Sequence, residues 1–252
     1  MRAVYVKAPF EFEIREIDLR ELRENEILVS VRACGVCGTD MQTASTEAKD
    51  FVSFGHEVSG VVLRAGGGVK NVEPGLRVAL ESSAFCRSCD MCRNGRPDLC
   101  GGVITYDWGA DTLGFADMLI APAELAVPIE EMPFDVAAVL EPMGVAMDLF
   151  LTADVKPGDD VLVIGLGPIG LLALKFAVIS GANRVVGASP HYATKRIETA
   201  LAYGASDIIL TDLTKEERAQ GGFDKVLVTA PPGAIPSAIK AAKTGGTVAY
   251  IG

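Results

Sequence analysis

The most constraining feature of this chain is a cluster of cysteines in a polar, turn-rich segment. Four of the six cysteines lie within fifteen residues, in a CxxCxxCx7C pattern that comprises Cys86, Cys89, Cys92 and Cys100. This spacing lets a single loop bring four thiolates to one ion, and a closed set of four sulfur ligands is the usual form of structural zinc. The pattern therefore predicts a protruding lobe at about residues 85–101 whose only substantial core is the metal, and removal of the ion should unfold the lobe locally.

Two other uses of this cysteine cluster are less favoured. Disulfides are typical of oxidising compartments, whereas cysteines at CxxC spacing in a reducing compartment are more often metal ligands. An iron–sulfur cluster is disfavoured because Cys100 follows a seven-residue gap and precedes Gly-Gly rather than proline. Since four-sulfur zinc leaves no open coordination position, a reaction centre is expected elsewhere in the chain.

The composition favours two domains and argues against some partners. With 252 residues, 49% of them hydrophobic and 22% charged, the chain can bury two ordinary cores. A net charge of −10 argues against nucleic-acid binding, which usually needs a basic face. Residues 1–17 carry charges every few positions and no long apolar stretch, so we expect neither a signal peptide nor a membrane anchor, and we expect a cytoplasmic protein.

The pattern of apolar residues divides the chain near residue 150. Before this point, short β-rich runs such as AVYV, EILVSVRAC and LRVAL alternate with Gly, Pro and Asn turns, which predicts a partly antiparallel β domain over residues 1–150. The glycine-rich segment Ala65–Lys70 is similar to a phosphate loop, but no helix pattern follows it. A hairpin turn is therefore the better interpretation of this segment.

From residue 151 onward, apolar strands alternate with helix-length segments. The predicted strands are VLVIG, RVVGA, DIIL, KVLVTA and GGTVAYIG, and one of the predicted helices spans residues 193–203. This alternation predicts a parallel, doubly wound α/β sheet over residues 151–252. The sequence ends at Gly252, after the fifth predicted strand, so we expect an incomplete sheet with an open edge at residues 247–251.

A glycine-rich turn follows the first of these strands and opens a helix. It is the GxGxxG motif Gly165-Leu166-Gly167-Pro168-Ile169-Gly170. In this context the first glycine makes the tight turn, the second lets a pyrophosphate approach the backbone, and the third lets the helix pack closely on the strand. We therefore expect a dinucleotide whose pyrophosphate lies on the helix N-terminus, bound by Gly165, Gly167, Pro168, Ile169 and Gly170.

The choice between NAD and NADP is usually made at the end of the next strand. A carboxylate there binds the ribose diol of NAD, but this strand ends in Gly187-Ala188-Ser189-Pro190-His191. Ser189 is a small hydrogen-bond donor at the expected position, and His191, Lys195 and Arg196 follow closely. NADP is therefore favoured over NAD, although Lys195 and Arg196 are equally compatible with an ordinary solvated helix face.

Three separated segments suggest a second metal centre. Cys37, His56 and Glu141 lie in ACGVCGTD, FGHEVSG and LEPMG. Singly, Cys37 could be a buried small residue, His56 a hydrogen-bonded core histidine and Glu141 a helix cap. Beside a dinucleotide motif, however, one thiolate, one imidazole and one carboxylate form a three-ligand set with a fourth position for water or a substrate oxygen, as in catalytic zinc.

These motifs occur in the order typical of the medium-chain zinc-dependent dehydrogenase/reductase family, which the chain resembles over nearly its whole length. The matching segments are ACGVCGTD, GHEVSG, the cysteine cluster, LEPMGVA, VKPGDDVLVIGLGPIG and GGTVAYIG. The resemblance implies a GroES-like catalytic domain, a Rossmann cofactor domain and two zinc ions per chain.

The resemblance also implies roles for residues around the second metal centre. Cys37 and His56 would be catalytic zinc ligands, and Glu57 and Glu141 would be direct or alternating ligands. Thr39 would be the hydroxyl that exchanges a proton with the substrate oxygen. Asp40 would orient His56, and Cys34 would serve in packing.

Glu141 and Gln42 refine the resemblance. Simple alcohol dehydrogenases of the family usually have cysteine at the position of Glu141, whereas the sorbitol and threonine dehydrogenase branch has Glu-Pro, as here in Glu141-Pro142. A harder oxygen ligand also suits a polyhydroxylated substrate. The family commonly has a proton-relaying histidine at the position of Gln42. Since glutamine cannot titrate, the relay must end at Thr39, a cofactor ribose or water.

We therefore predict a zinc-dependent oxidoreductase that transfers a hydride between a secondary alcohol, on a polyol or sugar, and NADP in preference to NAD. Its partner would be this small-molecule substrate rather than nucleic acid or membrane, and the protein would be a homo-oligomer, either a dimer or a tetramer. Two alternatives remain open. One is a primary-alcohol or aldehyde dehydrogenase on the same scaffold, and the other is a catalytically inactive zinc- and nucleotide-binding fragment.

Overall fold

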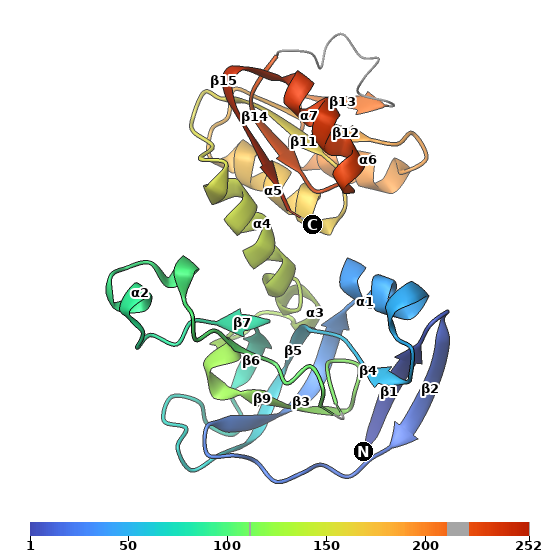
Figure 1. Cartoon of the computed structure of the whole chain (residues 1–252), viewed down its shortest axis with the longest axis vertical. Coiled ribbons are helices and arrows are strands. Elements are labelled where there is room, and N and C mark those ends of the chain that lie inside the picture. The colour runs from blue at the N-terminus through green and yellow to red at the C-terminus, as the bar shows by residue number, and fades with distance from the viewer. Residues whose placement is uncertain (111, 211–221, 252) are drawn as a thin grey trace. The chain divides into compact units, whose positions relative to one another are not determined.

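The computed structural model describes residues 1–110, 112–210 and 222–251, and Gly252 lies outside the described residues. The chain forms two compact units, Met1–Glu141 and Pro142–Gly252, both of which are drawn in Figure 1. The division falls before the predicted domain boundary at residue 150, within the helix α4 (Leu140–Thr152). None of the helices in the described part of the chain is long and apolar enough to cross a bilayer.

Two antiparallel sheets make up most of the first unit, which confirms the predicted β-rich domain. The larger sheet has five strands in the order β10-β6-β5-β3-β9, and the smaller has three in the order β2-β1-β4. The strands are β1 (Arg2–Lys7), β2 (Glu11–Glu16), β3 (Glu26–Gly35), β4 (Val52–Ser53), β5 (Glu57–Ala65), β6 (Arg77–Leu80), β9 (Met118–Pro122) and β10 (Ala126–Pro128). Segment 65–70 covers the end of β5 and the first part of the connection, residues 66–76, to its antiparallel neighbour β6, so the hairpin interpretation is confirmed.

Short helices and one further strand pair connect these strands. The helical segments of the first unit are α1 (Gly38–Gln42), the π-helix η1 (Thr43–Glu47), α2 (Asp90–Arg93), η2 (Pro97–Leu99), η3 (Ala123–Leu125) and α3 (Phe134–Ala137). The strands β7 (Ser83–Ala84) and β8 (Ile104–Thr105) pair with each other and flank the cysteine lobe in the sequence.

The pairing of β3 with β5 determines which loop residues meet. Ile27 and Val29 on β3 lie two positions apart and point into the same core as Val58 and Val62 on β5. With these faces buried, the register is determined, and it places Cys34 opposite Val58 and Gly35 opposite Glu57. The end of β3 and the start of β5 therefore lie side by side, and the residues just beyond them are neighbours.

The second unit contains the predicted parallel sheet. Its strands are β11 (Asp160–Ile164), β12 (Arg184–Ser189), β13 (Asp207–Leu210), β14 (Phe223–Val228) and β15 (Ala242–Tyr250), and they lie in the order β13-β12-β11-β14-β15 (Figure 1). All of these pairs are parallel. The described helices are α4, α5 (Pro168–Ile179), α6 (Thr194–Ala202), η6 (Pro232–Ala234) and α7 (Ile235–Ala241). The doubly wound α/β prediction is therefore confirmed.

Alternation along β11 shows why the sheet is covered on both faces. Val161 and Val163 belong to one buried cluster, together with Leu174 of α5. Leu162 and Ile164 belong to another buried cluster, which contains Ala238 and Ala241 of α7. A strand with apolar side chains on both faces must be covered on both faces, as in parallel sheets with crossover helices. This arrangement leaves the carboxyl ends of the strands as the open edge for a ligand.

Candidate metal centres and cofactor site

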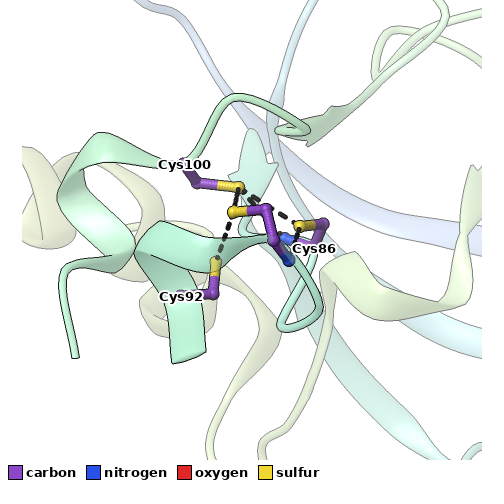
Figure 2. A group of neighbouring side chains, drawn as sticks. Cys86, Cys92 and Cys100 are labelled. Atoms are coloured by element: carbon purple, nitrogen blue, oxygen red, sulfur yellow. Dashed lines mark hydrogen bonds between the residues drawn. The ribbon is translucent and has the colours of Figure 1, made fainter. Parts of the chain in front are cut away.

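The four cysteines of the lobe converge on one point. Figure 2 shows the side chains of Cys86, Cys92 and Cys100 directed toward one another. The sulfur of Cys89 lies 3.5 Å from that of Cys92 and 3.9 Å from that of Cys100, and the sulfurs of Cys100 and Cys86 lie 3.5 Å apart. The predicted four-thiol group is thus assembled, with all ligand atoms within 4.8 Å of one another.

These spacings fit zinc and do not fit disulfides. Zn–S bonds of about 2.3 Å in a tetrahedral arrangement require sulfur atoms roughly 3.8 Å apart. The observed spacings of 3.5–3.9 Å agree with this value. A disulfide would need a separation of about 2.05 Å, and all six cysteines are free thiols.

Electrostatics in the lobe also favours a bound cation. Hydrogen bonds from Ser88 and Cys89 lower the pKa of Cys86 to about 5. Desolvation and the sulfurs of Cys89 and Cys100 raise the pKa of Cys92 to about 12. The opposite directions of these two shifts show that neighbouring thiols oppose one another's ionisation, and a bound cation would relieve that opposition.

The second group of ligands is formed by residues from two separate segments. Cys37 is the N-cap residue of α1 and lies two residues beyond the end of β3, while His56 precedes β5 and Glu57 begins it. The β3–β5 register brings these residues together, and one ligand atom from each lies within 4.8 Å of the other two. His56 is buried, whereas Cys37 and Glu57 are partly exposed. One thiol, one imidazole and one carboxyl form a donor set that fits catalytic zinc.

Asp40 joins the two segments that carry these ligands. One oxygen, Oδ2, accepts a hydrogen bond of 2.8 Å from the backbone N–H of Cys37. The other, Oδ1, accepts a 3.1 Å hydrogen bond from the backbone N–H of Gly55. Oδ1 lies 3.8 Å from Nδ1 of His56, which is too long for a hydrogen bond but close enough for a strong charge interaction. The buried Asp40 thus fixes the backbone on both sides of the group and acts on His56 through its charge.

Cys37 and His56 stabilise each other's charged forms, whereas the charged form of Glu57 is disfavoured. Hydrogen bonding with His56 lowers the pKa of Cys37. Burial alone would lower the pKa of His56, but the hydrogen bond with Cys37 and the negative charges of Cys37, Asp40 and Glu141 raise it to about 9. Burial, and next the charge of Glu141, raise the pKa of Glu57. Several acids around a single imidazole form an environment that attracts a cation.

Of the other residues predicted for this centre, Thr39 lies close to the ligand group and Glu141 lies further away. Thr39 lies beside the group, with its Oγ1 at 3.7 Å from the sulfur of Cys37. Glu141, in the first turn of α4, is outside the three-residue ligand group, and its charge acts on His56 and Glu57 from a greater distance. Its role as an alternating ligand stays a prediction.

Cys34 and Gln42 are close to Cys37 in the sequence, but neither belongs to the ligand group. Burial raises the pKa of Cys34 to about 12, so this cysteine is a neutral thiol, and it is outside the ligand group. The side-chain amide of Gln42 donates a 2.6 Å hydrogen bond to Oε1 of Glu47. The position that commonly holds a relay histidine is therefore occupied here by a side chain that pairs with a surface carboxylate.

Two aromatic residues beside His56 were not identified from the sequence. Trp108 contacts the His56 ring edge-on, with 5.7 Å between ring centroids, and Tyr106 lies edge-on to Trp108 at 5.6 Å. The Tyr106 hydroxyl donates a 3.4 Å hydrogen bond to the backbone carbonyl of His56. Trp108 is the single tryptophan of the chain and is 51% exposed. Its rarity was the only signal available, because no motif joins it to His56.

The second unit has a cavity of about 520 Å³ at the carboxyl ends of β11, β12 and β14. It is lined by Ile164, Gly165, Ala188, Ser189, Pro190, His191, Ala230, Gly233, Ala234 and Ser237. In an open parallel sheet, ligands bind at this edge, beside the strand where the chain order reverses. Here that strand is β11, which lies between β12 and β14.

The three motif glycines have different surroundings. Gly165 has φ +97°, which L side chains rarely adopt, and its carbonyl accepts a 2.8 Å hydrogen bond from the Thr229 hydroxyl. A Cβ at Gly170 would overlap the carbonyl oxygen of Gly165. At Gly167, by contrast, a Cβ would meet nothing within 4 Å, so the backbone is open there. The open space before the N-terminus of α5 fits a pyrophosphate.

The residues predicted to contact a 2′-phosphate are divided between the cavity and the surface. Ser189, which is buried, and His191, which is exposed, both line the cavity. Pro168 and Ile169 begin α5, while Lys195 and Arg196 lie exposed in the first turn of α6 and do not line the cavity. The contact of Lys195 and Arg196 with a cofactor stays a prediction.

The chain matches two family patterns that together span both units. Residues 23–131 match the alcohol dehydrogenase GroES-like domain, and residues 168–252 match the zinc-binding dehydrogenase family. D-Arabinitol dehydrogenase 1 of Uromyces fabae is 32% identical and aligns with 100% of this chain and 75% of its own length. L-Threonine 3-dehydrogenase of Pyrococcus horikoshii is also 32% identical, with 98% of this chain and 74% of its own length covered.

Solved structures show the same architecture. Galactitol-1-phosphate dehydrogenase from Escherichia coli superposes with a TM-score of 0.87 at 25% identity and covers 100% of this chain and 75% of its own. A structure from Sinorhizobium meliloti 1021, described as a zinc-binding dehydrogenase bound to NADP, has a TM-score of 0.85 at 29% identity, with 100% and 76% coverage. The chain thus spans about three quarters of the length of these proteins.

This chain therefore belongs to the medium-chain zinc-dependent dehydrogenase family. Members of this family are oxidoreductases that transfer a hydride between an alcohol and a nicotinamide cofactor, and this chain is an enzyme of that class. Its fold is a GroES-like domain followed by a Rossmann sheet. The predicted family and fold are both confirmed.

We expect Cys92→Ser to unfold the cysteine lobe without unfolding the β domain. Loss of one thiolate should weaken the binding of the ion that we predict to serve as the core of the lobe. Trypsin should then cleave after Arg87 and Arg93, which lie inside the lobe, at least about tenfold faster than in the unmodified protein. Cys34→Ser is the matched control, since Cys34 is also a cysteine of the first unit but lies outside the lobe. Equal cleavage rates for Cys92→Ser and the unmodified protein would show that no metal supports the lobe.

Proposed function

We propose that this chain oxidises a secondary alcohol group on a polyol or sugar, with NADP preferred over NAD. The observation that carries the proposal is the convergence of Cys37, His56 and Glu57 within 4.8 Å, with the Thr39 hydroxyl beside them. D-Arabinitol dehydrogenase and galactitol-1-phosphate dehydrogenase, to which the chain is similar, support a polyol substrate. The Glu141-Pro142 dipeptide supports the same branch.

The proposed metal ligands are Cys37, His56 and Glu57, which we call the dispersed group. The Thr39 hydroxyl beside them would transfer the proton. Bound zinc supplies Lewis acidity, which lowers the pKa of a substrate hydroxyl. Thr39 accepts the hydroxyl proton and releases it to water, since Gln42 cannot titrate and its amide is hydrogen-bonded to Glu47. Asp40 keeps Cys37 and the segment before His56 in place throughout.

The cavity of the second unit would hold the nicotinamide cofactor. A nicotinamide cofactor bound there would supply the hydride acceptor, so that loss of one hydride from the carbinol carbon and one proton from its hydroxyl would convert the alcohol to a ketone. Gly167 and the N-terminus of α5 would receive the pyrophosphate. Ser189 and His191 would contact the ribose and its 2′-phosphate, and none of the described residues that line the cavity carries a carboxylate that would repel it.

Two zinc ions per chain are part of the proposal, because the described residues contain two separate ligand groups. The cysteine lobe would hold one ion for structure alone. The dispersed group would hold the other, with a position open to the substrate. A homo-oligomeric state and a cytoplasmic location stay predictions.

Turnover of a substrate panel tests the proposed reaction. With NADP, we expect sorbitol or arabinitol to be oxidised with a higher kcat/KM than threonine or ethanol. Cys37→Ser should lower kcat by about a thousandfold or more, because Lewis-acid stabilisation contributes several kcal/mol to such reactions. Binding of NADPH, followed by its fluorescence, should be unchanged in this variant because Cys37 lies outside the cofactor unit.

Cys34→Ser serves as the control for this experiment. Cys34 is three residues from Cys37 but is a partly buried thiol outside the ligand group, so the variant should keep turnover within a few-fold of the unmodified enzyme. Full activity of Cys37→Ser would remove the metal from the mechanism. Binding of NADPH without turnover of any alcohol would instead support an inactive nucleotide-binding protein, and preferential use of ethanol would support a primary-alcohol dehydrogenase.

The cofactor preference should depend on the start of α6. We expect kcat/KM for NADP to exceed that for NAD by about tenfold or more, since each charged hydrogen bond to a phosphate contributes roughly 1.5–3 kcal/mol. The double variant Lys195→Ala/Arg196→Ala should raise KM for NADP and leave KM for NAD unchanged. Lys240→Ala, which removes an exposed charge from α7, should change neither constant. A preference of the unmodified enzyme for NAD would contradict the assignment.

A further inference from the structure

A glycine at the end of β3 lies directly beneath the side chain of Glu57. Gly35 and Glu57 are partners in the antiparallel register of β3 and β5. A Cβ added to Gly35 would overlap Oε2 of Glu57 and would lie 3.0 Å from both Cβ and Cδ of the same side chain. The glutamate therefore folds across the space that any other residue at position 35 would occupy.

The backbone at Gly35 does not itself require glycine. Gly35 is not among the glycines with positive φ, so an alanine could adopt the same backbone conformation. The three nearest atoms to the added Cβ all belong to Glu57. Steric exclusion at this position thus comes from one side chain, and that side chain is flexible at its far end.

The position of the Glu57 carboxyl links this contact to the metal. Glu57 reaches the sulfur of Cys37 and the imidazole of His56 within the 4.8 Å limit of the ligand group. A Cβ at position 35 would occupy the place of Oε2, so the carboxyl would have to rotate away from its present site. We propose that Gly35 is a positioning residue, whose missing side chain allows Glu57 to lie within ligand distance of Cys37 and His56.

This inference rests on the proposed function, because it assumes a metal centre at Cys37, His56 and Glu57. It adds Gly35 as a residue that determines where the Glu57 ligand lies. Gly35 touches neither substrate nor cofactor in this account. It acts only through Glu57, so its effect should disappear when the Glu57 carboxyl is absent. That dependence distinguishes a positioning role from a general contribution to the stability of the β3–β5 pair.

The test is a double-mutant cycle on zinc release. The full chain is loaded with zinc, and transfer of the ion to a chromophoric chelator is followed; the phase that is missing in Cys37→Ser identifies the dispersed centre. We expect Gly35→Ala and Glu57→Ala each to accelerate this phase about tenfold or more, as losses around a metal site commonly do. The double variant Gly35→Ala/Glu57→Ala should release zinc at the rate of Glu57→Ala alone.

Gly38→Ala is the matched control. Gly38 lies three residues further on, and a Cβ there would meet nothing within 4 Å, so its zinc release should equal that of the unmodified protein. Unchanged release in Gly35→Ala, or effects that multiply in the double variant, would overturn the inference. If Gly35→Ala does not fold, recovery of folding in the double variant, measured by circular dichroism, would support it, and failure of both variants to fold would overturn it.

The readout separates this inference from the enzymatic proposal. Zinc release requires neither substrate nor cofactor. A chain without turnover on any alcohol would therefore contradict the proposed reaction while leaving the role of Gly35 open to the same measurement. Conversely, an active enzyme in which Gly35→Ala releases zinc normally would contradict only the role of Gly35.

Discussion

The antiparallel register of β3 and β5 is the constraint on which the dispersed centre depends. Core residues such as Val29 and Val58 fix that register, because a shift by one position would turn the apolar face of a strand toward solvent. Cys37 lies just beyond the end of β3, and His56 and Glu57 lie at the start of β5. Packing of the β-sheet thus brings a thiol, an imidazole and a carboxyl together, although about twenty residues separate them in the sequence.

The two metal groups differ in how the chain assembles them. The cysteine lobe would draw its four ligands from one short segment, so the proposed ion would replace the apolar core that the segment lacks. The dispersed group instead takes its geometry from a sheet that is folded around its own apolar core, and Asp40 fixes the backbone on either side. A centre supported in this way can leave one coordination position open, because its ligands do not need the metal to stay together.

Local spacing predicted some parts of this protein well, and long-range contacts explain the rest. The CxxCxxCx7C pattern was sufficient for the lobe, and the strand followed by GxGxxG was sufficient for the Rossmann unit. No spacing rule connects Cys37 with His56, so their pairing rested on their chemistry beside a dinucleotide motif and on the resemblance to a family. The overlap of Gly35 with Glu57 and the contact of Trp108 with His56 were not predictable, since each depends on the strand register or on a loop path that leaves no periodic signal.

The central claim is that Cys37, His56 and Glu57 hold a second zinc ion, distinct from the ion of the lobe. Anomalous diffraction at the zinc edge, from crystals of the zinc-saturated protein, measures this directly. We expect two peaks per chain, one among the four lobe cysteines and one bounded by Cys37, His56 and Glu57. A single peak, confined to the lobe, would contradict it.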